Sequence, residues 1–431
     1  MLVAGVRHRA GNGHDGHVQR LSWSGLAALS SLWLAWNAQW LTIAPILMPQ
    51  AVAALVPAHP ELWSGLTVGA GALVALLVTP VAGALSDRSR NPRGRRSRFL
   101  ITGVLGSCVG LVALGWAVSA NLIALAVVYL VLQFWWNWGA GPFAGLIPDI
   151  VAPDQHAAAS GWLNALGIIG TILGSAAMFT YRPGHPWAVI ALWIALSLVC
   201  LAVTVARVRE PAPAPPPWPG LGSFARSFVL PLAENRNFYW VLVTRLLNNM
   251  GVWSVFTFLV LYLRFVVGLP ETRATQLMST LTGVGAVLAI AASLVTAWMI
   301  ARVGVVRVVR QSSWVMALAA AGYAGAAFAP QLWLVVPLLL VFGLANGVFG
   351  AADWALALAV LPTGQDAGKD MGIWHVCLVL PQIIGPITTG VLITAIEHAA
   401  SARAAYALAF AVAAAWFLAA SIYVGKLQVA P

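Results

Sequence analysis

The chain contains 431 residues, of which 61% are hydrophobic and 8% are charged, and its formal net charge is +11. Soluble proteins carry about 25% charged residues, so this composition excludes a soluble globular enzyme or regulatory domain. The basic residues are scattered between apolar runs and form no basic domain, which argues against a nucleic-acid partner.

Apolar runs long enough to cross a bilayer, about 18 residues each, recur along the chain. The sequence therefore predicts an all-α membrane protein. It begins with a polar, Gly- and His-rich segment over 1–21, which we expect to be a disordered cytoplasmic tail and not a signal peptide. Turn signals at 119–121 and 329–331 divide the two longest apolar stretches. Twelve transmembrane helices are predicted, at about 22–49, 62–85, 98–118, 121–148, 157–179, 187–207, 238–263, 274–300, 310–329, 332–360, 370–395 and 402–424.

The positive charges predict the orientation of these helices. Lys and Arg concentrate in cytoplasmic loops, and 18 of the 23 in this chain fall on the side of the N-terminus when the chain crosses twelve times. Six of the 18 lie in the short loop 88–98, where they anchor the topology. Four lie on the opposite side, and Arg245 lies inside a helix. We therefore expect a multi-pass protein of the cell membrane with both termini in the cytoplasm.

The chain divides into two halves. Residues 208–236 contain the run PAPAPPPWPG, which predicts a semi-rigid cytoplasmic linker between an N-terminal six-helix bundle, 22–207, and a C-terminal one, 237–425, followed by a tail, 426–431. The segment 141–174 also matches the segment 350–385, pairing Gly161 with Gly372 and Gly174 with Gly385. A duplicated six-helix unit predicts a carrier whose binding site lies between the halves near the membrane centre.

The loop after the second helix has a specific sequence, GALSDRSRNPRGRRSRF. It resembles the G-x-L-S-D-R…G-R-R signature of the major facilitator superfamily. Gly94 lies seven residues after Asp87, a longer spacing than in most of the superfamily. This spacing resembles that of the glycoside–pentoside–hexuronide:cation symporters and the related sucrose carriers. The same branch is resembled by four further stretches, FAGLIPDIVAP, RNFYWVLVTR, DWALALAVLP and LPQIIGP. The resemblance implies two six-helix bundles in the major facilitator fold and a cytoplasmic latch that biases the equilibrium between conformations. The latch, or gating motif, comprises Gly83, Asp87, Arg88, Gly94, Arg95 and Arg96.

Polar residues inside the membrane are costly and mark transport pathways. Trp33, Asn37 and Trp40 share one face of the first helix, and an amide and Trp cluster recurs in the fourth. Amides can donate to or accept from sugar hydroxyls, although any single Trp is more often a packing or interfacial residue. The predicted substrate-binding residues are Trp33, Asn37, Trp40, Gln133, Trp136, Asn137, Asn164, Asn248, Asn249, Asn346 and Gln382.

Asp353 is the only acidic residue deep inside a predicted helix, and a buried carboxyl can bind and release a proton. Asp353 with Arg245 or His375 is therefore the candidate for proton coupling, and a static buried ion pair is the alternative. Sodium-coupled members of the resembled branch use carboxylates in helices 2 and 4. The first six helices are predicted to contain no acid within the membrane, which favours proton symport or uncoupled transport over sodium coupling.

The leading functional prediction is a secondary active transporter of a small solute, a sugar or glycoside, working by alternating access and linked to protons. Proton-driven efflux of hydrophobic compounds is the alternative, and a non-transporting membrane sensor on a carrier fold is the third. The sequence shows no nucleophile–base pair, metal cluster or phosphate loop, so we expect no enzyme, metal or cofactor. Cys108, Cys200 and Cys377 lie in apolar runs, where no disulfide is expected. We expect a monomer.

Overall fold

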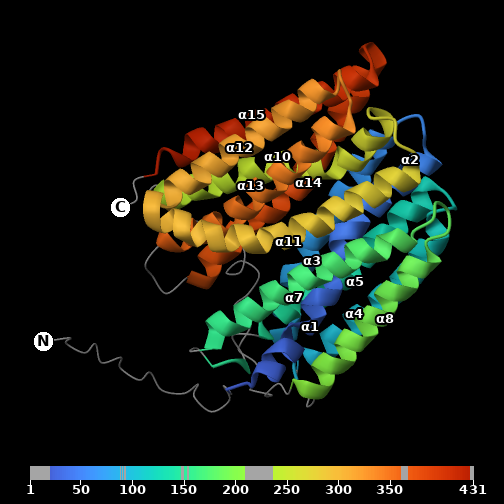
Figure 1. Ribbon diagram of the computed structural model, residues 1–431. Coiled ribbons are helices and arrows are strands. Elements are labelled where there is room, and N and C mark those ends of the chain that lie inside the picture. The colour runs from blue at the N-terminus through green and yellow to red at the C-terminus, as the bar shows by residue number, and fades with distance from the viewer. Residues whose placement is uncertain are drawn as a thin grey trace, which may run out of the picture.

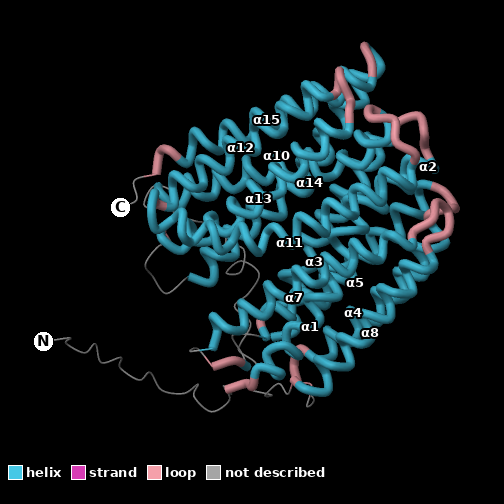
Figure 2. Tube along the Cα trace, viewed as in Figure 1, coloured by secondary structure: helices cyan, strands magenta, loops and turns pink. Residues whose placement is uncertain are grey.

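The computed structural model describes residues 20–87, 89, 91, 94–146, 150–152, 155–208, 236–360 and 367–427. Within these ranges the chain is a set of long helices joined by short loops (Figures 1 and 2). The predicted tail and the predicted linker lie almost wholly outside the described residues, and Arg88 of the gating motif lies outside them as well.

All twelve predicted helices are present, in the order of the sequence. In the N-terminal half they are α1 (Trp23–Thr42) with its continuation α2 (Met48–Leu55), α3 (Pro60–Asp87), α4 (Ser97–Ala117), α5 (Leu122–Ala144), α7 (His156–Ala177) and α8 (Trp187–Arg207). In the C-terminal half they are α10 (Arg236–Phe265), α11 (Glu271–Val303), α12 (Val305–Ala326), α13 (Leu332–Ala359), α14 (Ala367–Ala399) and α15 (Ala402–Val424). Eleven helices of the described chain are long and apolar enough to span a membrane. The twelfth, α12, carries Arg307 and Arg310 in its first two turns.

Local sequence explains where these helices begin and how the first one continues. The predicted turn at 119–121 is confirmed, because Asn121 caps α5 by accepting a 2.9 Å hydrogen bond from the Ala124 amide. The first membrane helix is longer than predicted. It passes from α1 through a π-helical turn, η1 (Ile43–Leu47), into α2. Pro45 lies inside that turn, and because proline has no amide hydrogen it interrupts the regular α-helical bonding there.

The two halves share one packing plan. In the first half α1 packs on α7 and α8, while α3 and α4 pack on α5. In the second half α10 packs on α14 and α15, while α11 and α12 pack on α13. A Cβ on Gly174 of α7 would lie 2.0 Å from the Ala38 oxygen of α1, and one on Gly385 of α14 would lie 3.3 Å from the Met250 oxygen of α10. The glycines paired by the sequence repeat therefore face equivalent helices.

The halves meet where α3 packs on α14, where α7 packs on α11, and where α10 contacts η1 and α2. We call the end of the molecule at which α1 begins and α15 ends the proximal end, and the end that carries α2 the distal end. The closest approach of α3 to α14 is near the distal end, where a Cβ on Gly65 would lie 2.3 Å from the Pro386 oxygen. In Figure 1 the halves converge at the distal end and diverge toward the proximal end.

Candidate functional site

A chain of hydrogen bonds follows α5 in the N-terminal half. Gln133 donates from Nε2 to the Tyr129 hydroxyl at 2.8 Å, and Asn137 donates from Nδ2 to the Gln133 carbonyl oxygen at 2.8 Å. The Thr79 hydroxyl of α3 donates to Asn137 Oδ1 at 3.0 Å. Gln133 is buried and Asn137 is half-buried. These bonds hold the Asn137 amide in a fixed orientation at the edge of the helix packing.

The predicted face of α1 lies against α7 and α10. Asn37 donates to the Trp33 carbonyl oxygen at 2.8 Å, and a Cβ on Gly167 of α7 would lie 3.0 Å from the Trp33 indole and 3.4 Å from Asn37 Nδ2. The Trp40 ring lies 5.6 Å from the Trp253 ring of α10. The three predicted residues of α1 are all half-buried. The structure therefore places Trp40 at the junction of the two halves, whereas Trp33 and Asn37 contact α7 of their own half.

Two predicted substrate residues lie in different surroundings. Trp136 is 5% exposed and donates from its indole nitrogen to Gln39 Oε1 at 2.8 Å. Gln39 in turn donates to the Ser197 hydroxyl of α8 at 2.5 Å, so Trp136 belongs to the polar core of the N-terminal half. Asn164 is exposed on α7, three residues before Gly167 and therefore on a neighbouring part of the same face.

In the C-terminal half Arg245 of α10 and Asp353 of α13 form a buried ion pair, with exposures of 6% and 0%. Asp353 Oδ1 has no hydrogen-bond partner among the described residues. Asn249 donates to the Arg245 carbonyl oxygen at 2.9 Å. Asn248 instead donates to the Ser313 hydroxyl of α12 at 2.9 Å, inside the half. The structure therefore pairs Asp353 with Arg245, one of the two partners considered from the sequence, and the role of the pair in proton coupling stays a prediction.

The other predicted residues of this half belong to α13 and α14. Asn346 is half-buried on α13, two turns before Asp353. Gln382 is buried on α14 and donates to the Leu378 carbonyl oxygen at 3.3 Å. The side chain of His375 lies outside the described residues.

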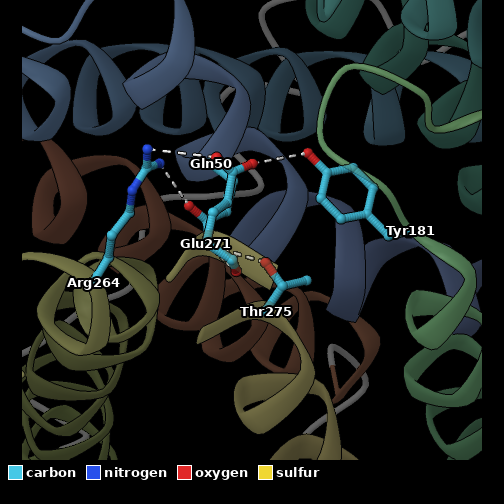
Figure 3. Close-up of polar contacts among 5 residues, drawn as sticks. All are labelled: Gln50, Tyr181, Arg264, Glu271 and Thr275. Carbon is cyan, nitrogen blue, oxygen red and sulfur yellow. Dashed lines mark hydrogen bonds and ion pairs between the residues drawn. The ribbon is translucent and has the colours of Figure 1, made fainter. Parts of the chain in front are cut away.

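A polar network that the sequence analysis missed joins the halves at the distal end. We call it the distal gate, and Figure 3 shows its members: Gln50, Tyr181, Arg264, Glu271 and Thr275. Gln50 of α2 donates to the Thr275 hydroxyl at 3.0 Å and accepts from Arg264 at 3.0 Å. Glu271 accepts from the Tyr181 hydroxyl at 3.4 Å and pairs with Arg264 at 3.4 Å. The gate ties α2 and the segment after η3 (Met178–Thr180) to α10 and α11.

The distal gate is largely shielded from solvent. Gln50 and Thr275 are buried, and the Arg264 and Glu271 side chains are 24% and 16% exposed. Burial, together with the negative charge of Glu271, raises the pKa of Tyr181, so its hydroxyl stays protonated and donates. The sequence signal that could have revealed the gate is Gln50, a single polar residue that follows Pro49 in an otherwise apolar segment.

The structure places most of the gating motif within the N-terminal half. Arg96, 6% exposed, donates to the Pro142 carbonyl oxygen at 2.9 Å and so joins the start of α4 to α5. Gly94 has a φ of 110°, which favours glycine, and Arg95 directly follows it. Asp87 is the last residue of α3, and its side chain lies outside the described residues.

Gly83 of the gating motif lies on α3. A Cβ there would lie 3.8 Å from the nearest atom of α5, which is an ordinary contact. The close approach of α3 to α5 instead requires Gly141, where a Cβ would lie 2.3 Å from the Thr79 oxygen.

The prediction that the first six membrane helices contain no acid is wrong. Helix α3 begins at Pro60, two residues earlier than expected, and this places Glu61 in its first turn. Glu61 is 2% exposed, and its Oε1 accepts a 2.8 Å hydrogen bond from the Tyr406 hydroxyl of α15. The error arose because Pro at the first helical position extends a helix that hydropathy alone starts later.

A family model described as Major Facilitator Superfamily matches residues 25–365 of this chain. The chain is similar to the general alpha-glucoside permease of Schizosaccharomyces pombe, with 27% identity over 160 residues that cover 34% of this chain and 29% of the permease. It is also similar to the sucrose transport protein SUC4 of Arabidopsis thaliana, with 28% identity over 133 residues that cover 27% of this chain and 26% of the relative. Each alignment therefore spans less than a third of the relative's length.

Two solved structures illustrate the shared fold. The nucleoside transporter NupG aligns with a TM-score of 0.69 at 15% identity, covering 94% of this chain and 98% of the other. A bacterial homolog of the human lysosomal transporter Spinster, in an inward-facing and unoccupied conformation, aligns with a TM-score of 0.67 at 15% identity and the same coverage.

Proposed function

Since this chain belongs to the Major Facilitator Superfamily and is a secondary transporter of the membrane, we propose that it carries a sugar or glycoside by alternating access. The observation that carries this proposal is the pair of hydrogen-bonded amides, Asn37 on α1 and Asn137 on α5, together with the Trp33 ring, which stacks on Phe143 of α5. An amide can both donate to and accept from a sugar hydroxyl. The partial similarity to an alpha-glucoside permease and a sucrose transport protein supports the same class of substrate.

We propose that the proximal end faces the cytoplasm and the distal end faces the outside of the cell. The excess of Lys and Arg on the proximal side supports this orientation. In this orientation the distal gate closes the external side, and the transporter is in an inward-open conformation. The Pro-rich linker and both tails then lie in the cytoplasm, and the motif around Asp87, Arg88 and Gly94 acts as a latch in the opposite, outward-open conformation.

We propose that Asp353 carries the coupling proton. Its carboxylate is paired with Arg245 in a site from which water is excluded, so each charge compensates the other. A proton on Asp353 neutralises the carboxyl and frees the Arg245 guanidinium to donate to a substrate hydroxyl. Substrate and proton binding would then be thermodynamically linked, as symport requires.

Uptake into proteoliposomes tests the function. The purified protein is supplied with labelled maltose and sucrose, with an imposed pH gradient that is acidic outside or with a sodium gradient. We expect accumulation of at least one glucoside that the pH gradient drives and a protonophore abolishes. Drug or dye export without sugar uptake would favour the efflux alternative, and binding without transport of any solute would favour the sensor.

A variant pair tests the coupling residue. Asp353→Asn should abolish accumulation driven by the pH gradient while leaving exchange of labelled for unlabelled sugar measurable, because exchange needs no net proton movement. Arg310→Gln, which removes an exposed charge from α12, is the control and should accumulate normally. Full pH-driven accumulation by Asp353→Asn would contradict the assignment.

A further inference from the structure

Glu61 is a buried carboxyl in the interface between the two halves. Its backbone and its side chain both meet the C-terminal half: a Cβ on Gly390 of α14 would lie 2.4 Å from the Glu61 carbonyl oxygen, and Oε1 accepts from the Tyr406 hydroxyl of α15. The second carboxyl oxygen, Oε2, is buried and has no hydrogen-bond partner among the described residues. Because this contact joins α3 to α14 and α15, separation of the halves at the distal end would break it.

The charged and titratable groups around Glu61 provide no compensating cation. No described ion pair includes Glu61. Glu397 of α14 is exposed and acts on Glu61 with the same sign of charge. His59 and His398 stack on each other across the halves, with ring centroids 4.8 Å apart. Arg403, at the start of α15, is exposed at the surface.

We infer that Glu61 is a proton-binding site of the distal interface, and that a proton taken up from the distal side must be bound there before the distal end can close. This site is separate from Asp353, which lies on α13. In the closed state Glu61 is only 2% exposed, so we expect its proton to stay bound until the halves separate again. Glu61 is then a sensor of pH on the distal side, whereas Asp353 carries the transported proton.

The sign of the effect follows from the contacts. An ionised Glu61 carboxylate is buried without a cation, which is strongly disfavoured, while the neutral carboxyl is tolerated. The Tyr406 hydroxyl, the Glu61 backbone amide and the first turn of α3 favour the ionised form, but burial is the larger contribution. When α3 separates from α14 and α15, water reaches Glu61 and the ionised form is no longer penalised. Acid on the distal side therefore favours closure. A doubly protonated His59 and His398 pair would act in the opposite direction, because two like charges would face each other.

A cysteine at Ser279 reports opening of the distal end. Thr275, Ser279 and Gly283 follow one face of α11 at intervals of four residues. Thr275 contacts Gln50, and a Cβ on Gly283 would lie 3.4 Å from Ser175 of α7, so the buried Ser279 lies between two contacts that join the halves. Ser279→Cys, in a chain whose three native cysteines are replaced by alanine, should react with a membrane-impermeant maleimide only when the distal end is open.

The rate of labelling is measured in right-side-out vesicles as the outside pH is lowered at constant sodium. At each pH it is divided by the rate for a reference cysteine, Ala120→Cys, at an exposed position in the turn between α4 and α5, because the thiolate is the reactive form and its fraction falls in acid. With Glu61 present we expect this ratio to fall as the outside becomes more acidic, by at most about tenfold per pH unit for one linked proton. Glu61→Gln mimics the neutral acid, so its ratio should be low and independent of pH. Tyr406→Phe keeps the carboxyl and should keep the acid dependence, which supplies a second variant if Glu61→Gln folds poorly.

Several results would overturn the inference. One is an acid dependence that survives in Glu61→Gln. Another is labelling that becomes faster in acid and loses this dependence in His59→Asn, since the histidine pair would then be the sensor. A third is a rate that responds to sodium at fixed pH and loses that response in Glu61→Gln, since the site would then hold a metal cation. The inference rests on the proposed orientation, but the experiment separates the two claims. Labelling that occurs only in inverted vesicles, with the pH response intact, would show that the orientation is reversed and would leave the role of Glu61 unchanged.

Discussion

The ion pair of Arg245 and Asp353 allows a quantitative test of how the C-terminal half is held together. Both side chains are almost fully buried. Removing one partner of a buried pair leaves an uncompensated charge and costs about 3–5 kcal/mol. Asp353→Asn and Arg245→Gln should each therefore lower the free energy of unfolding by about that amount. In the double variant no charge remains, so it should be no less stable than the better of the two single variants.

A double-mutant cycle in detergent measures this coupling, with the unfolding of each variant followed by circular dichroism during titration with sodium dodecyl sulfate. The pair of Arg264 and Glu271 in the distal gate is the matched comparison, because its side chains are partly exposed and its charged atoms are 3.4 Å apart. An exposed pair contributes about 0.2–1 kcal/mol. Additive effects at Arg245 and Asp353, or a coupling no larger than that of the gate pair, would refute the reasoning from burial.

Three further predictions concern packing, the gate and the substrate site. Gly174→Ala would place a methyl group 2.0 Å from a carbonyl oxygen of α1 and should destabilise the protein by about 1–3 kcal/mol. Gly161→Ala is the control, because a Cβ there would meet nothing within 4 Å, and this variant should melt at or above the wild-type temperature. Equal melting temperatures of the two variants in detergent would contradict this prediction. Glu271→Gln removes one charge from the distal gate, so the closed state should lose about 0.5–1 kcal/mol of stabilisation. Maleimide labelling of a cysteine in the distal interface should therefore become about two- to fivefold faster. An unchanged rate would show that the gate does not hold the halves closed. Asn137→Leu should raise the KM for glucoside uptake at least tenfold, because the substrate would lose about 1.5 kcal/mol or more of hydrogen bonding. The melting temperature of this variant should change little. An unchanged KM would show that Asn137 does not bind the substrate.

Much of the fold could be predicted from the sequence because the membrane leaves few alternatives. A backbone in hydrocarbon must satisfy its own hydrogen bonds, so each long apolar run becomes a helix. The sequence also predicted the turn at Asn121, because a helix cap depends only on neighbouring residues. It paired Gly174 with Gly385 because both lie in the repeated segment, and in the structure both face equivalent helices. Asp353 was predicted to act with Arg245 or with His375, because charges inside membrane helices pair with one another, and the structure pairs it with Arg245.

The sequence by itself therefore determined the helices, their order and the division into two related halves. Only the tertiary structure decided which polar residues meet. Gln39 proved to be the partner of Trp136, Glu61 meets Tyr406 from the far end of the chain, and the distal gate draws on four separate segments. The physical reason is that contacts between helices depend on their rotation and their axial register. Both are set by close approaches such as that of Gly390 to Glu61, which involve the whole packed molecule and leave no periodic pattern in one helix.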